Sequence, residues 1–156
     1  MEFRTILGDP PPRILAYPPE SVVAEKLHAM ATLGERNSRY KDFYDLHALA
    51  GALSFDRSTL VRAVAATFDR RATPVTVELP VALTAPFYSD ESRAGQWRAY
   101  VTRNGLPDAP ADFVQVGDRL TRFLQPIWNG VRSAGDPTGW WSQGGPWTST
   151  TPEPAP

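Results

Sequence analysis

Side chains that could act on a phosphate group gather between residues 20 and 45 of the 156-residue chain. Lys26 offers a compact positive charge of the kind that binds phosphate. Asp42 and Asp45 are three positions apart, which puts both carboxylates on one face of a helix. An ionised aspartate can accept the proton of an attacking hydroxyl. These residues form a candidate site that binds a triphosphate and activates a hydroxyl; the alternative is solvated helix surfaces and one buried salt bridge.

Two adjacent helices are predicted to position these residues. The first spans 19–33, since proline suits the first turn of a helix at Pro19 and glycine ends the helix at Gly34. The second spans about 41–53. Helices joined by a short loop usually pack antiparallel, so the lysine and both carboxylates are expected at the mouth of a helical pair. The apolar faces of the two helices are Val23, Leu27 and Met30, and Phe43, Leu46, Ala50 and Leu53.

The rest of the chain predicts a mainly α fold, a five-helix bundle with a short N-terminal β hairpin or edge. Asp56 is a good N-cap for a third helix. The other expected elements are a helix from after Asp56 to Arg71, an irregular crossing over 72–88, helices over about 90–103 and 112–131, and two short strands over 2–17.

The composition changes after Ser133, where Gly, Pro, Ser and Thr dominate. We therefore divide the chain into a helical region over 1–132 and a disordered tail over 133–156. Three tryptophans in this tail, Trp140, Trp141 and Trp147, favour local docking on the surface over a linear interaction motif.

Several short motifs resemble the second half of the AbiEii/AbiGii nucleotidyltransferase toxin family. The similarity extends from about residue 3 to about 128, and the order and spacing of the motifs carry it. The motifs are Tyr17-Pro18-Pro19-Glu20, Ala24-Glu25-Lys26-Leu27, Lys41-Asp42-Phe43-Tyr44-Asp45-Leu46, the segment Thr67–Pro74, and Gln96-Trp97.

This resemblance implies the C-terminal part of a nucleotidyltransferase of DNA polymerase β-like type. Such toxins, of type IV toxin–antitoxin and abortive-infection systems, transfer a nucleotide from a nucleoside triphosphate (NTP) to an RNA acceptor such as tRNA, or sometimes to protein. Carried over to this chain, Lys26 binds the triphosphate and Asp42 helps catalysis, with Asp45 as a second catalytic candidate or a supporting partner. The complete enzyme is expected to need an NTP and Mg²⁺.

The chain departs from the family pattern in one respect. The family's first half carries a Gly-Ser turn and an Asp-x-Asp pair that holds two Mg²⁺ ions, and this sequence contains neither. We therefore predict no metal site and no nucleotide transfer by this chain alone. Its expected partners are a missing N-terminal catalytic half or a cognate antitoxin, and an RNA acceptor. The alternative is a non-catalytic helical module or remnant that binds an antitoxin or RNA.

Composition excludes several other classes of protein. The absence of cysteine rules out disulfide scaffolds and thiolate metal sites. Only two histidines are present, His28 and His47, and we expect ordinary surface or interface roles for both. A net charge of −1 argues against nucleic-acid binding by charge alone. We therefore favour solvated or dipole-complementing roles over an RNA-binding patch for four arginines, Arg36, Arg39, Arg70 and Arg71. No apolar run approaches a membrane span, and a cytoplasmic protein is predicted.

Overall fold

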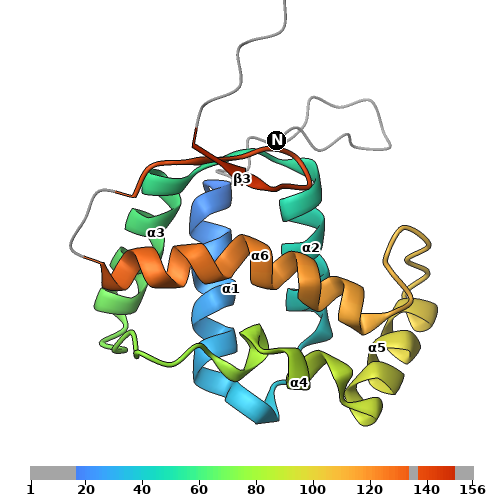
Figure 1. Ribbon diagram of the computed structural model, residues 1–156. Coiled ribbons are helices and arrows are strands. Elements are labelled where there is room, and N and C mark those ends of the chain that lie inside the picture. The colour runs from blue at the N-terminus through green and yellow to red at the C-terminus, as the bar shows by residue number, and fades with distance from the viewer. Residues whose placement is uncertain (1–16, 134–136, 150–156) are drawn as a thin grey trace, which may run out of the picture.

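A computed structural model describes residues 17–133 and 137–149 of the chain. The fold is mainly helical, as the sequence predicts, with a small three-stranded antiparallel sheet. The expected strands over 2–17 lie outside the described residues. Figure 1 shows α1 between α2 and α3, with α6 crossing these three helices. The helices are α1 (Pro19–Leu33), α2 (Tyr40–Ala52), α3 (Arg57–Arg70), α4 (Ala85–Ser89), α5 (Glu91–Arg103) and α6 (Phe113–Arg132).

Local sequence signals explain where the helices begin. α1 starts at Pro19 and ends before Gly34, whose φ of 55° favours glycine. Three later helices begin after an aspartate whose side chain accepts a hydrogen bond from a backbone N–H of the first turn. These aspartates are Asp56, Asp90 and Asp112, before α3, α5 and α6.

The segment over 72–88 is more ordered than its prolines suggest. A 3₁₀ turn, η2 (Val81–Leu83), is followed by α4, whose first turn accommodates Pro86. Burial stabilises this short helix, because Tyr88 packs on α6 where Gly117 leaves room for its ring. A Cβ at that glycine would come within 2.3 Å of Tyr88 Cγ. The expected irregular crossing is therefore wrong for these two elements.

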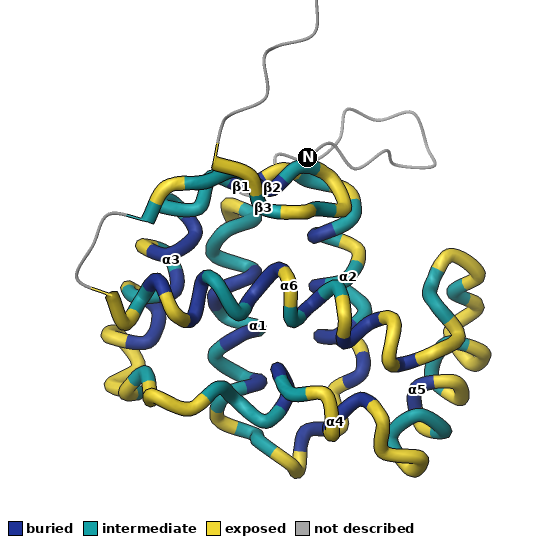
Figure 2. Tube along the Cα trace, viewed as in Figure 1, coloured by how far each residue is buried: buried dark blue, intermediate teal, exposed yellow. Residues whose placement is uncertain are grey.

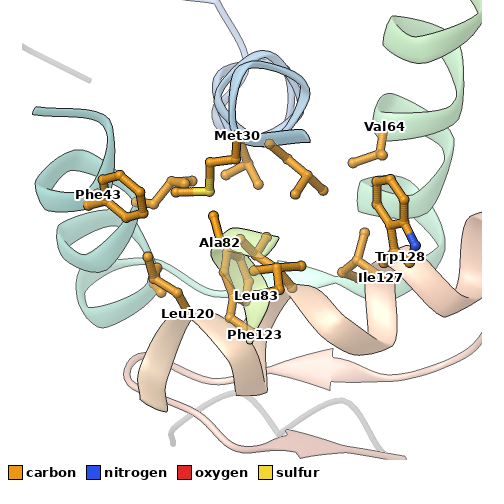
Figure 3. Close-up of a cluster of buried hydrophobic side chains, with 14 of the residues drawn as sticks. Met30, Phe43, Val64, Ala82, Leu83, Leu120, Phe123, Ile127 and Trp128 are labelled. Atoms are coloured by element: carbon orange, nitrogen blue, oxygen red, sulfur yellow. The ribbon is translucent and has the colours of Figure 1, made fainter. Parts of the chain in front are cut away.

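The core lies between α1 and α6, and η2 fills the space between them. Figure 3 shows Ala82 and Leu83 of η2 among side chains from four helices. Figure 2 shows that buried residues line the inner sides of α1, α2, α3 and α6, whereas α5 is mostly exposed. The labelled helical members of this core are Met30, Phe43, Val64, Leu120, Phe123, Ile127 and Trp128.

Part of the segment after Ser133 belongs to the fold. β1 (Phe55–Asp56), β2 (Trp140–Trp141) and β3 (Trp147–Thr148) pair antiparallel in that order. The indole of Trp141 is buried against Phe123, and its Nε1 donates to the Ala50 carbonyl at 2.7 Å. The predicted disorder is therefore wrong for residues 137–149, because composition does not reveal that the tryptophans bury apolar surface.

Within residues 17–133 and 137–149, no helix has both the length and the apolar character needed to cross a membrane.

Candidate functional site

Lys26, Asp42 and Asp45 meet in the structure. Lys26 Nζ lies 2.9 Å from Asp42 Oδ1 and 3.0 Å from Asp45 Oδ2. The helical pair α1–α2 creates this contact, because Lys26 is in mid-α1 and both aspartates are in the first two turns of α2. The side chain of Asp42 is only 5% exposed, whereas those of Lys26 and Asp45 are 17% and 26% exposed. The sequence-predicted residues thus form one ion-pair cluster.

Two further cations join this cluster from α2 and the residue before it. Arg39 Nε lies 3.0 Å from Asp42 Oδ2, although this oxygen accepts no hydrogen bond of good geometry. Lys41 Nζ donates to Asp45 Oδ2 at 2.9 Å, and this hydrogen bond raises the pKa of Lys41. Three cations therefore surround two carboxylates, which leaves the cluster with an excess positive charge.

A cleft of about 390 Å³ lies over the outer face of α1. Lys26, Arg39 and Asp42 line it on the α2 side, and Arg71, which follows α3, lines it on the opposite side. The remaining lining residues come from α1: Val22, Glu25, His28, Ala29, Thr32 and Leu33. The cluster is thus open to a ligand, and Arg71 adds a cation that the local pattern around Lys26 does not reveal.

The carboxylates of this site do not fit a Mg²⁺ ion. Mg²⁺ takes oxygen ligands in near-octahedral geometry. Here both oxygens of Asp42 and Oδ2 of Asp45 already contact Lys26, Arg39 or Lys41. Within the described part of the chain, no group of three or more His, Cys, Asp or Glu residues could hold a metal ion.

The two histidines have separate partners. His28 Nε2 lies 2.8 Å from Thr73 Oγ1 on the α3 side of the cleft. Burial lowers the pKa of His28, and the nearby Arg71 lowers it further. His47 lies instead beside Arg119 of α6, at a different cleft of about 680 Å³. The charges of that cleft balance, with Asp108 and Asp118 against Arg119 and Arg122. It therefore offers less to an anion than the smaller cleft on α1.

His47 makes the stability of the fold depend on pH. Burial, and then the charge of Arg119, lowers the pKa of His47 from 6.5 to about 4. Between these two pH values His47 is protonated in the unfolded chain but not in the folded chain. The free energy of unfolding therefore falls as the pH falls. We expect His47 to account for a loss of about 2 kcal/mol between pH 7 and pH 4.5.

Urea unfolding of the wild type and of His47→Gln at both pH values measures this loss. The variant should lose less stability on acidification than the wild type, since glutamine does not titrate. An equal loss in both proteins would show that His47 is protonated as readily in the folded chain as in the unfolded one.

Comparison with known proteins agrees with the motifs around the cleft. The sequence model of the family described as "Nucleotidyl transferase AbiEii toxin, Type IV TA system" matches residues 1–119, more than half of the chain. The match includes the whole α1–α2 cluster and Arg71. No curated protein and no solved structure matches the chain significantly. The chain belongs to the AbiEii nucleotidyl transferase toxin family of type IV toxin–antitoxin systems.

Proposed function

We propose that the cleft on α1 binds the triphosphate of an NTP, which this chain holds for transfer to an RNA acceptor. The observation that carries the proposal is the position of Lys26, whose Nζ is fixed by two carboxylates at the edge of a cleft. A held ammonium group loses little further freedom when it binds a phosphate, so its position favours binding. Arg39 and Arg71 line the same cleft and supply further positive charge.

Asp42 and Asp45 have different roles in this proposal. Asp45 shares Lys26 with Asp42 and orients the ammonium group. Asp42 lines the cleft and Asp45 does not, and Oδ2 of Asp42 is the oxygen that Lys26 does not bind. We assign to this oxygen the acceptance of a proton from an attacking hydroxyl, for which the exposed Arg39 must give up its 3.0 Å contact with it. Asp42 is thus the proposed catalytic residue and Asp45 its supporting partner.

The transfer step needs more than this chain in our proposal. The sequence has no Asp-x-Asp pair, and Asp42 and Asp45 are already paired with cations. We therefore assign the metal carboxylates to a separate catalytic half, and we propose a cognate antitoxin as a further partner. NTPs and RNA are both cytoplasmic, which supports action in that compartment.

A helical module that binds without catalysis is the second candidate. Asp42 and Asp45 are paired with Lys26 and Lys41, as in an ion pair that only stabilises the fold. The core between α1 and α6 is well filled, as in a domain that folds by itself. A labelled-nucleotide transfer assay on RNA separates the two functions. Transfer that begins only when the catalytic half is added supports the enzyme role. Triphosphate binding with no transfer in the reconstituted complex supports the module.

Lys26→Met tests the binding site directly. Methionine keeps the apolar stem of the side chain and removes its charge. Titration with a fluorescent NTP should give a dissociation constant at least about tenfold weaker than that of the wild type.

Lys41→Met is the matched control, because Lys41 also pairs with Asp45 but does not line the cleft. Its side chain is 75% exposed, so the fold should tolerate the change. We expect its affinity to stay within about twofold of the wild type. Equal losses in the two variants would mean that only the total charge matters, contrary to the proposal.

A further inference from the structure

Glu25 holds two arginines side by side at the α3 side of the cleft. Its Oε1 lies 2.6 Å from Arg70 Nη2, and its Oε2 lies 2.7 Å from Arg71 Nη2. Each carboxylate oxygen accepts a charge-assisted hydrogen bond from a different guanidinium group. Glu25 thus holds Arg70 and Arg71, which lie 45 and 46 positions later in the sequence, across the contact between α1 and α3. We call these three residues the Glu25 fork.

The Glu25 fork lies where two clefts meet. The cleft on α1 adjoins a neighbouring cleft of about 760 Å³. The two clefts share three lining residues, Val22, Glu25 and Arg71. The neighbouring cleft is also lined by Arg70, Tyr17, Ser21 and Thr67. A ligand in either cleft can therefore reach a guanidinium group of the fork.

The ion pairs of the fork are easy to exchange. The Glu25 side chain is 38% exposed, and those of Arg70 and Arg71 are 63% and 50% exposed. Ion pairs at such exposed positions contribute only about 0–1 kcal/mol each, because water and salt screen them. A terminal phosphate has more acceptor oxygens than a carboxylate, and a phosphodiester has as many non-bridging ones, so either is a competitor for the same two guanidinium groups.

We infer that the Glu25 fork is a second anion site, at which Glu25 competes with the phosphate group of a ligand for Arg70 and Arg71. In the free protein the carboxylate neutralises one of the two positive charges and holds both arginines at the junction. A phosphate displaces the carboxylate without any large movement of α1 or α3. Glu25 therefore sets the affinity of the junction for phosphate, and it is a regulatory residue rather than part of the Lys26 cluster.

The phosphate can come from two sources that share this chemistry. One is the NTP in the first cleft, in which case the inference rests on the proposed function. The other is the phosphodiester backbone of a single strand in the neighbouring cleft, where the 80%-exposed Tyr17 offers a ring for base stacking. Separate titrations with each ligand distinguish these sources.

Two variants that change the charge of the fork in opposite senses should shift its affinity for phosphate in opposite directions. Glu25→Gln keeps the size of the side chain and removes the competing charge, so it should tighten phosphate binding by about threefold or more. Arg71→Ala should weaken the same binding by a similar factor. The ligands are a fluorescent NTP and a labelled single-stranded RNA of ten nucleotides, each titrated into the full chain. A purely structural fork predicts no change in either affinity.

Two variants away from the clefts control for total charge. Glu20→Gln removes a negative charge elsewhere on α1, and Arg98→Ala removes a positive charge on α5. Opposite shifts in the fork variants beyond those of the controls, with either ligand, support the inference and identify the source of the phosphate. Unchanged affinities in both fork variants, or weaker binding by Glu25→Gln, overturn it. If NTP binding survives in that case, the proposed function stands without the fork.

Discussion

Replacing Trp141 with alanine should lower the free energy of unfolding by about 4 kcal/mol. The indole is 1% exposed and packs against Phe123 and Trp147. Its removal leaves a large cavity and also removes the hydrogen bond from the indole N–H to the Ala50 carbonyl, which keeps only the one from Gly144 N. Gly145 lies directly on the ring, where a Cβ would come within 2.5 Å of it, so the turn between β2 and β3 loses its packing as well.

Urea unfolding followed by far-UV circular dichroism measures this loss without relying on tryptophan fluorescence. Trp140→Ala is the matched control, since Trp140 is the neighbouring residue of β2 but is only partly buried. It should cost about 1 kcal/mol. Similar small losses in both variants would mean that residues 137–149 add little to the core, contrary to their position in the structure.

The second large effect is expected at Lys26. Lys26→Met should destabilise the fold by about 3 kcal/mol, because it leaves the almost buried carboxylate of Asp42 with only the exposed Arg39 as a partner. Asp42→Asn should cost only about 1 kcal/mol, since Lys26 keeps its contact with Asp45. Removing the lysine of this ion pair is therefore expected to lower the free energy of unfolding more than removing the charge of the aspartate.

A double-mutant cycle tests this asymmetry. Lys26→Met combined with Asp42→Asn removes both charges and should recover about 2 kcal/mol of the summed single losses. The double variant also helps to separate folding from binding, because by these figures it is about 1 kcal/mol more stable than Lys26→Met and still lacks the ammonium group. Strictly additive losses would show that Lys26 and Asp42 do not interact energetically, whatever their distance.

The sequence predicts most of the helical fold because its signals are local. Asp56, Asp90 and Asp112 each precede a helix that begins in the next residue, as capping chemistry requires. The meeting of Lys26 with Asp42 follows from a short loop between two amphipathic helices. The family assignment, confirmed over residues 1–119, rests on the same local motifs.

Long-range packing accounts for what the sequence does not predict. α4 exists because Tyr88 finds space above Gly117, nearly thirty residues further along the chain. β2 pairs with β1 across 84 positions or more, so neither strand has a local pattern of its own. Arg71 reaches the cleft only because α3 packs on α1. The sequence around Arg71 does not indicate that this residue lies in the same cleft as Lys26. These contacts depend on the tertiary arrangement, which periodicity and capping do not encode.

Mapping where a triphosphate binds tests the central claim most directly. A titration of the ¹⁵N-labelled chain with ATP, followed by amide chemical shifts, reports the position of the ligand without any mutation. We expect the largest shifts along residues 22–33 of α1, at Arg39 and Asp42, and at Arg71, all of which line or border the cleft. Shifts centred on His47 and Arg119 of the other cleft, or no shifts at saturating ATP, would contradict the account.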